Sequence, residues 1–295
     1  MDASPFLARL KDGRVLVADG ATGTNLQKRG LPRGVAGEQW VLEKPEEILR
    51  LHRDFIEAGA DIILTCTFGG TSVRLEHAGL ADRAEEISRK AVELARQAAR
   101  EAQGAATLVA GSIGPTGQLL KPYGPLEVDL AIAAFAAQAK TLTEAGADLL
   151  VIETQFDLGE AEAAIKGVHS VSTLPLVCSF SFDRGTRTMM GVRPSQAGRQ
   201  LEAWGVDVVG INCGRSLDEN LGSLKELRAA TALLVWFKPN AGLPRLDDDG
   251  CPVYDVTPEN MGFYACDWVE AGANVVGGCC GTSPEHLQQI ALKVK

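Results

Sequence analysis

Short apolar runs alternate with longer amphipathic stretches along the whole chain. The runs are rich in Val, Ile and Leu, with few polar interruptions, which is typical of strands buried on both faces. In chain order, the predicted strands cover residues 14–19, 61–66, 107–111, 148–153, 174–181, 207–212, 232–237 and 274–278. The intervening pattern is helical, most clearly at residues 45–58, 83–102, 125–145 and 257–271.

Eight strand-then-helix units predict parallel strands covered by helices. Eight strands also close a (β/α)8 barrel, although a doubly wound open sheet is an alternative that the strand count leaves open. No low-complexity segment or linker interrupts the units, so we expect one barrel domain over residues 1–295. Residues 238–258 lack clear periodicity and are predicted to form a functional loop above the barrel mouth.

A short pattern recurs along the chain, as EAGADIILTCTF from residue 57, EAGADLLVIETQ from 144, AWGVDVVGINCG from 203 and EAGANVVGGCCG from 270. Each copy predicts a helix that ends at a glycine cap, followed by a tight turn and a strand. Reactive side chains lie at or just beyond the ends of these strands, namely Thr67, Glu153, Cys213, Cys279 and Cys280. The C-terminal ends of barrel strands are where barrel enzymes carry their active sites, so the recurrence favours a functional role.

Composition narrows the class of protein. With 45% hydrophobic and 23% charged residues, the chain has the balance of a soluble globular protein. Its net charge of −9, without a dense Lys/Arg cluster, argues against nucleic acid or an anionic membrane as the main partner. The N-terminal MDASPFLARLKDG does not resemble a signal peptide, and no apolar run reaches the ~18 residues of a membrane span. The seven irregularly spaced cysteines predict a reducing, cytoplasmic location.

Residues 277–282 read GGCCGT, with two adjacent cysteines at the end of the last predicted strand. Neighbouring cysteines do not easily form a disulfide with each other, so the pair indicates either a metal site or two small buried hydrophobes. Cys213 in GINCG ends the sixth predicted strand, and one strand separates it from the eighth. The two strand ends can therefore converge on one ion, and a catalytic zinc keeps three protein ligands and an open position.

The remaining cysteines and the histidines carry weaker signals. Cys66 is a further thiol near the predicted mouth, whereas packing roles are expected for Cys178, Cys251 and Cys266. The histidines lie in or beside predicted helices and are expected to be non-catalytic: His52, His77, His169 and His286. Glycine-rich stretches at 19–24, 111–117 and 277–282 match no phosphate-binding motif, so they indicate close backbone approach to a small ligand.

Two acidic residues end apolar strands, Asp19 in VLVADGATGTN and Glu153 in LLVIETQ. A carboxylate in that position is costly unless it is paired or faces a ligand. Together the two acids could hold an ammonium group or act as general acid and base. A structural ion pair with Arg or Lys is the competing interpretation.

An ordered set of motifs covers essentially the whole chain: ADGATGTNLQ at 18–27, TCTFGG at 65–70, ETQ at 153–155, GINCG at 210–214, KPNAGLP at 238–244 and GGCCGT at 277–282. The set resembles the homocysteine S-methyltransferase family, which includes the homocysteine-binding module of cobalamin-dependent methionine synthase and betaine–homocysteine methyltransferase. GGCCG together with an upstream NCG is a highly specific signature of that family.

The resemblance implies a (β/α)8 barrel that binds zinc through Cys213, Cys279 and Cys280. It also implies that Asp19 and Glu153 hold the amino group of homocysteine. It further implies that the backbone around Gly20–Ala21 and Cys66–Thr67 receives the substrate carboxylate. Asn240 matches a residue that can approach the zinc when substrate is absent. Relatives usually carry Asn or Gln in place of Cys66. If the side chain at this position takes part in substrate binding, the departure affects the expected preference for the thiol acceptor.

The implied activity is zinc-dependent methyl transfer to homocysteine, which gives methionine. A free thiol with a pKa near ~8.5 is mostly protonated at neutral pH, and zinc coordination turns it into a thiolate without a general base. A methylated corrinoid such as methylcobalamin is the preferred donor, while S-methylmethionine, betaine and a different thiol acceptor stay open. We expect the chain to be a methyl-acceptor module that receives its donor from outside, free or on a separate corrinoid or folate protein.

Two other classes compete with this interpretation. In a structural zinc protein the three cysteines would only fasten strands together, and two acids on the same predicted face argue against that. In a carboxylate-based hydrolase or an aldolase barrel, Lys238 would be the strand-end base.

Overall fold

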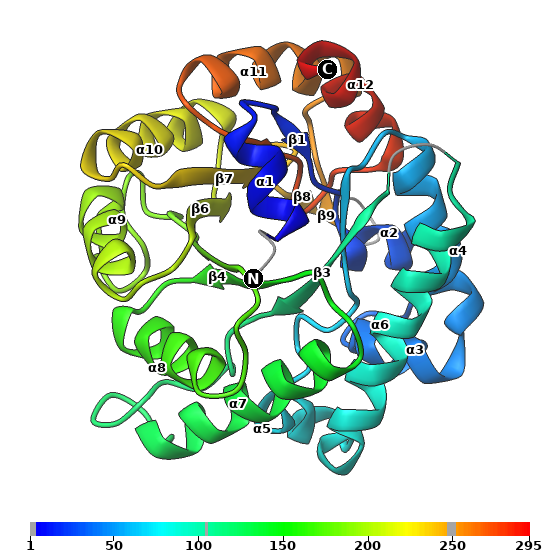
Figure 1. Cartoon of the computed structure of the whole chain (residues 1–295), viewed down its shortest axis with the longest axis vertical. Coiled ribbons are helices and arrows are strands. Elements are labelled where there is room, and N and C mark those ends of the chain that lie inside the picture. The colour runs from blue at the N-terminus through cyan, green and yellow to red at the C-terminus, as the bar shows by residue number, and fades with distance from the viewer. Residues whose placement is uncertain (1–3, 104–105, 247–251) are drawn as a thin grey trace.

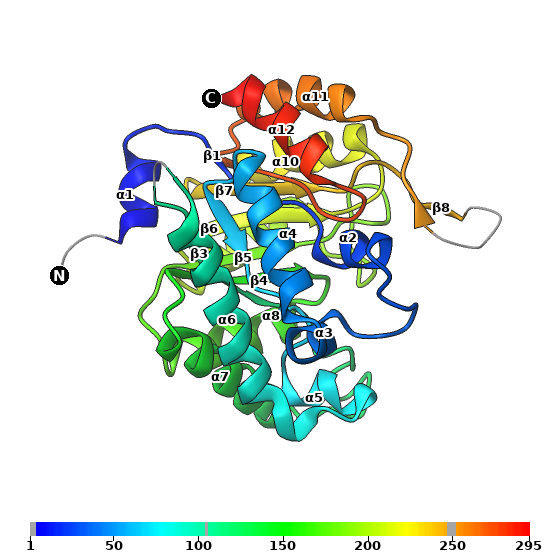
Figure 2. The ribbon, with the colours of Figure 1, turned by 90° about the vertical axis from the view of Figure 1, so that its right-hand side faces the viewer.

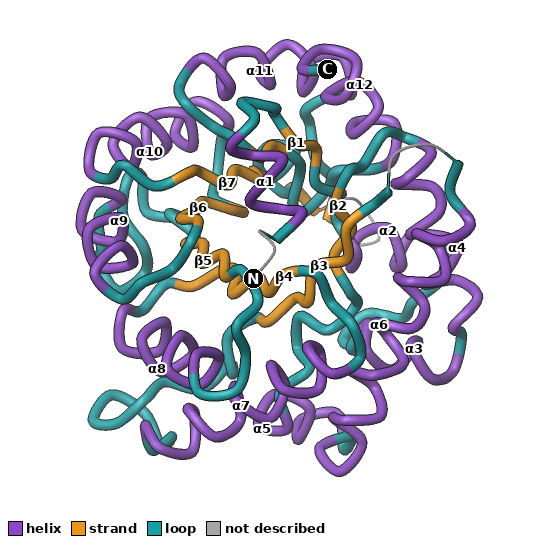
Figure 3. The backbone as a smooth tube through the Cα atoms, viewed as in Figure 1, coloured by secondary structure: helices purple, strands orange, loops and turns teal. Residues whose placement is uncertain are grey.

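The eight predicted strands form one parallel barrel (Figures 1 and 3). The computed structural model describes residues 4–103, 106–246 and 252–295. Around the sheet the strands follow the order β1 (Leu16–Val17), β10 (Val275–Val276), β7 (Leu234–Pro239), β6 (Val208–Cys213), β5 (Leu176–Phe180), β4 (Leu149–Gln155), β3 (Leu108–Ile113) and β2 (Ile62–Leu64). A parallel bridge between Ala18 and Ile62 joins β1 to β2. The predicted barrel is therefore confirmed, and the doubly wound alternative is wrong.

Helices surround this sheet, and the four most clearly predicted ones lie where expected: α4 (Pro45–Glu57), α6 (Ala84–Glu101), α7 (Val128–Glu144) and α11 (Pro258–Glu270). The other helices of the outer layer and of the loops are α2 (Thr22–Lys28), α3 (Gly37–Glu43), α5 (Ser72–Leu75), η1 (Glu76–Ala78), η2 (Ala81–Arg83), α8 (Leu158–His169), α9 (Pro194–Ala203), α10 (Leu217–Ala230) and α12 (Pro284–Val294). Among the described residues, no helix is both long and apolar enough to cross a membrane.

The apolar core has two parts because side chains alternate along each strand. On β4, Leu149 and Val151 belong to the cluster inside the barrel, while Leu150 and Ile152 belong to the layer between strands and helices. Both faces are buried, which explains the nearly continuous apolar runs in the sequence.

A short helix that the sequence pattern did not predict closes one end of the barrel. Helix α1 (Pro5–Lys11) places Phe6 and Leu10 in the interior cluster, and both side chains are buried. Figure 1 looks onto α1 lying across the barrel. Figure 2 shows α1 at one end and β8 at the other, so the barrel is covered at the end opposite the C-terminal loops.

Residues 238–258 were predicted to be a loop, and that prediction is wrong in part. The segment contains a short antiparallel hairpin of β8 (Arg245–Leu246) and β9 (Pro252–Val253). It also carries the end of β7. The expectation for Cys251 lies outside the described residues.

Replacing Phe6 by Ala tests the contribution of α1. We expect the free energy of unfolding to fall by about 3–5 kcal/mol, because the substitution removes a fully buried aromatic ring from the barrel interior. Urea unfolding measures the change. Leu292→Ala, at an exposed position of α12, is the control and should change the stability little. An equal loss in both variants would contradict a specific role of α1.

Candidate metal and substrate site

The glycines of GGCCGT allow the end of β10 to pack tightly. A Cβ atom on Gly277 would lie 2.5 Å from the carbonyl oxygen of Ala18, so this position brings the ends of β10 and β1 together. Gly281 has a φ of +83°, and its Cα faces the ring of Tyr254, where a side chain would clash. The two glycines therefore let the chain around Cys279 and Cys280 pack closely against Ala18 and Tyr254, while the expected close approach to a small ligand stays a prediction.

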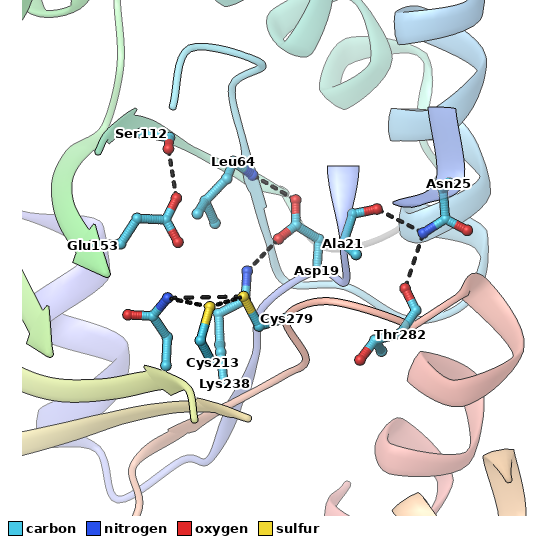
Figure 4. A network of polar contacts seen from close by, with 11 residues as sticks. Asp19, Ala21, Asn25, Leu64, Ser112, Glu153, Cys213, Lys238, Cys279 and Thr282 are labelled. Carbon is cyan, nitrogen blue, oxygen red and sulfur yellow. Dashed lines mark hydrogen bonds and ion pairs between the residues drawn. The ribbon is translucent and has the colours of Figure 1, made fainter. Parts of the chain in front are cut away.

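Three thiols converge at this end of the barrel. Cys213 is the last residue of β6, and Cys279 and Cys280 follow β10. Their sulfur atoms all lie within 4.8 Å of one another, and those of Cys213 and Cys279 are 2.9 Å apart (Figure 4). Within the described chain this is the one group of three or more His, Cys, Asp or Glu side chains close enough to hold a metal ion.

The donor set fits zinc. Tetrahedral zinc with Zn–S bonds of about 2.3 Å places its sulfur ligands about 3.8 Å apart, so small shifts of these side chains would suffice. All three cysteines are free, and within the described residues no disulfide competes for them. Hydrogen bonds to Cys279 and Cys280, together with burial, raise the pKa of Cys213 well above its usual value. Three thiolates in this space therefore require a cation.

Backbone strain marks the same place. Among the described non-glycine residues, only Thr154 (φ 61°) and Cys213 (φ 59°) have left-handed conformations. Such residues cost of order 1–3 kcal/mol each and persist where the surroundings impose them, commonly at functional sites. Thr154 directly follows Glu153, so the strain falls on one predicted metal ligand, Cys213, and next to one predicted substrate residue.

Asn212 joins these two strained residues, and the sequence analysis missed it. Its side-chain oxygen accepts hydrogen bonds from the Thr154 backbone N–H at 2.8 Å and from the Ser179 hydroxyl at 2.6 Å. Its side-chain nitrogen donates to the Thr154 hydroxyl at 2.6 Å. The only sequence signal was a polar residue beside the cysteine of GINCG.

Asp19 and Lys238 form a buried ion pair. Lys238 Nζ donates to Asp19 Oδ1 at 2.6 Å, and the backbone N–H of Leu64 donates to Oδ2 at 2.7 Å (Figure 4). Both oxygens of Asp19 are therefore engaged, as in the ion-pair interpretation. Burial opposes the charge of Lys238, but Asp19 and Glu153 outweigh it and raise the pKa of the lysine. A lysine held protonated is a poor general base or Schiff-base nucleophile, which weighs against the aldolase alternative.

Among the described residues, Glu153 has no such ion-pair partner in contact. Its Oε1 accepts a hydrogen bond from the Ser112 hydroxyl at 2.5 Å. Burial raises the pKa of Glu153 to about 7, although Lys238 acts in the opposite direction. The carboxyl group is therefore poised to gain from a cationic ligand, because a nearby positive charge favours its ionised form.

A cavity of about 510 Å³ connects these groups. The predicted site residues that line it are Gly20, Ala21, Cys66, Glu153, Cys213, Cys279 and Cys280, and Lys238 lines it as well. Asp19 and Thr67 lie behind this lining: Asp19 holds Lys238, and the Thr67 hydroxyl donates to the Ser112 carbonyl at 2.7 Å.

The expected carboxylate contacts divide into two groups. The backbone N–H groups of Ala21 and Thr67 already donate to the carbonyls of Thr282 and Thr65. In the described part of the chain, those of Gly20 and Cys66 have no partner within the protein, and both residues line the cavity. The Cys66 side chain is buried, and desolvation followed by the charge of Glu38 raises its thiol pKa far above the usual value.

Asn240 and the histidines complete the predicted set. Asn240 donates from Nδ2 to the Gly214 carbonyl at 2.8 Å, while its buried Oδ1 has no partner in the part of the chain that the structure describes. The histidines lie in helices, as expected: His52 in α4, His77 in η1, His169 in α8 and His286 in α12. Tyr254, which the sequence analysis did not single out, lines the cavity, and burial followed by the charge of Cys280 raises its pKa.

Comparison with known proteins identifies the family of this chain. The family model described as homocysteine S-methyltransferase matches residues 16–294. The chain belongs to the homocysteine S-methyltransferase family. Among solved structures, the family member is similar to the metallated form of the homocysteine methyltransferase MmuM from Escherichia coli, with a TM-score of 0.82, 29% identity, and coverage of 98% of this chain and 99% of that one.

Curated relatives of this family member are much longer. It is 32% identical to the methionine synthases of Mycobacterium tuberculosis and Mycobacterium leprae, in each case over 95% of this chain. The chain spans about a quarter of their length, 25% and 24% respectively. A methyltransferase from Methanosarcina mazei, 15% identical with a TM-score of 0.64, shares the fold.

Replacing Glu153 by Gln should stabilise the metal-free protein at neutral pH. The folded protein keeps Glu153 protonated up to about pH 7, whereas its usual pKa is 4.5, so wild-type stability is lost as the pH rises through this window. The stability of Glu153→Gln relative to wild type should increase from pH 4.5 to 8 by up to about 3 kcal/mol. Urea unfolding across this range measures it, with Glu57→Gln as an exposed control. A difference that does not grow with pH would contradict the burial argument.

Proposed function

We propose that this chain transfers a methyl group to the thiol of homocysteine, giving methionine, at a zinc ion held by Cys213, Cys279 and Cys280. The observation that carries the proposal is the convergence of three free thiols within 4.8 Å on the wall of the cavity that contains Glu153. Membership of the homocysteine S-methyltransferase family and the likeness to a metallated methyltransferase support it. A purely structural zinc site would not need an adjoining cavity with a buried carboxylate.

The mechanism assigns a role to each part of the site. Cys213, Cys279 and Cys280 would hold the zinc ion, which would supply the positive charge that favours the thiolate form of the homocysteine sulfur. Glu153 binds the substrate ammonium group, and Asp19 contributes its charge from behind the cavity wall, where Lys238 and the Leu64 N–H engage its two oxygens. The free backbone N–H groups of Gly20 and Cys66 receive the substrate carboxylate. The thiolate then attacks the methyl carbon in line: a C–S bond forms, the donor–methyl bond breaks, and its electron pair leaves with the donor.

The open oxygen of Asn240 gives it a part in the same proposal. Its buried Oδ1 lacks a partner among the residues that the structure describes and could serve as a fourth metal ligand while homocysteine is absent. The backbone N–H of Asn240 donates to the Cys213 carbonyl at 3.1 Å, which holds the residue next to one of the proposed ligands.

The donor that we propose is a methylated corrinoid presented from outside the barrel, on a separate polypeptide or domain. The methionine synthases that the chain resembles support this choice, while S-methylmethionine and betaine stay open as alternatives. Cys66 is buried at a position where relatives usually carry Asn or Gln, so a different thiol acceptor stays open as a further alternative. The six described cysteines are free, in keeping with the reducing cytoplasm that we propose as the location.

Methyl transfer by the zinc-loaded protein tests the proposal directly. With homocysteine and excess methylcobalamin we expect slow formation of methionine, and a comparison with S-methylmethionine and betaine identifies the donor class. Cys279→Ala should lose both zinc and activity, whereas Cys178→Ala, a buried cysteine on β5 away from the cluster, should keep both. Full zinc occupancy in Cys279→Ala would refute the metal assignment. Turnover with betaine but not with methylcobalamin would identify betaine, rather than a corrinoid, as the donor.

Recognition of the amino group is tested with Glu153→Gln. Homocysteine binding should weaken by roughly 1.5–3 kcal/mol, the worth of a hydrogen bond to a charged group. An analogue that lacks the amino group should bind the variant and the wild type equally, because it makes no contact with Glu153. Isothermal titration of both ligands provides the measurement. If the analogue loses as much affinity as homocysteine, another residue binds the amine.

A further inference from the structure

Asn212 lies beside two of the three clustered sulfur atoms and is fully buried. Its Nδ2 is 3.5 Å from Cys213 Sγ on β6 and 3.8 Å from Cys279 Sγ beyond β10, both within hydrogen-bonding range for sulfur. The same nitrogen donates to the Thr154 hydroxyl at 2.6 Å. The two hydrogens of the amide can therefore serve Thr154 and the pair of sulfurs.

The orientation of this amide is fixed by its other contacts. The backbone N–H of Thr154 can only donate, so the atom that faces it at 2.8 Å must be the oxygen Oδ1. The Ser179 hydroxyl reinforces this orientation from β5. Consequently the N–H groups, and not the oxygen, face the sulfurs of Cys213 and Cys279.

The Thr154 hydroxyl extends the arrangement. Its oxygen accepts the amide N–H, which leaves its own hydrogen available for Cys213 Sγ at 3.9 Å. Asn212 thus connects Cys213 to Thr154, the residue that follows Glu153. Both Cys213 and Thr154 have the strained left-handed conformation.

We propose that Asn212 is a positioning residue for the metal-binding sulfurs, which orients Cys213 and Cys279 and donates an N–H to their thiolates. This inference rests on the proposed function, since it assumes that the two sulfurs bind zinc. Partners around metal ligands orient them and tune their donor strength, and their loss typically weakens metal binding 10- to 100-fold. Hydrogen bonds to thiolates also spread the negative charge that three sulfurs would otherwise concentrate.

The test compares Asn212→Asp with Ser179→Ala. Asn212→Asp keeps the acceptor for Thr154 and Ser179 but removes the N–H donors. Ser179→Ala removes one contact to Oδ1 and leaves the donors in place. We expect zinc affinity, measured by competition with a chromogenic chelator, to fall about 10- to 100-fold in Asn212→Asp and to stay near the wild-type value in Ser179→Ala.

A neutral variant and a spectrum separate this role from added charge and from a general loss of structure. Asn212→Ser, which is uncharged and too short to reach the sulfurs, should show the same direction of change. In the cobalt-substituted protein, the sulfur-to-metal charge-transfer band should move to longer wavelength in both Asn212 variants only, because an unbonded thiolate gives up its electrons more easily. Unchanged affinity and band in the Asn212 variants, or an equal loss in Ser179→Ala, would overturn the inference. A wild-type protein that binds no zinc would instead overturn the proposed function.

Discussion

Three sulfur atoms that share one small space impose the constraint on which the C-terminal face of the barrel depends. Like charges at these distances repel strongly where water is scarce, so the thiolate form of the cluster needs both a cation and hydrogen-bond donors. The surrounding residues meet the second need. Asn212 and Thr154 direct donors toward Cys213, and Tyr254 lines the same cavity as the cysteines.

The two carboxylates beside the cysteine cluster differ in their hydrogen-bond partners. Asp19 is neutralised by Lys238 within hydrogen-bonding distance, while Glu153 receives only a neutral hydroxyl. The barrel therefore keeps one buried acid satisfied and leaves the other short of positive charge. Such an unsatisfied group lowers the stability of the free protein and is retained where a ligand can satisfy it, which is the usual compromise between stability and function.

Sequence reasoning reached the barrel and the three sulfurs because both have local signals. Apolar runs mark strands, and cysteines at strand ends mark the face on which they lie. The partner of Asp19 has no local signal, since Lys238 is 219 residues away and only barrel closure brings the two together. Asn212 was missed because its role depends on contacts with β4, β5 and the chain after β10, which a motif on β6 does not reveal. The left-handed conformations of Thr154 and Cys213 were also hidden, since neither position carries a glycine.

The separation of these partners along the chain has a consequence for folding. Cys213 and Cys279 are 66 residues apart, and the Asp19–Lys238 pair links the first strand of the barrel to β7. Contacts of such long range form only after the loop-closure entropy of the intervening chain has been overcome. A metal ion would therefore find its ligands assembled only in a barrel that has already closed. In a classical zinc finger the ion organises an otherwise unfolded peptide, whereas here the apolar barrel must be the template for the ion.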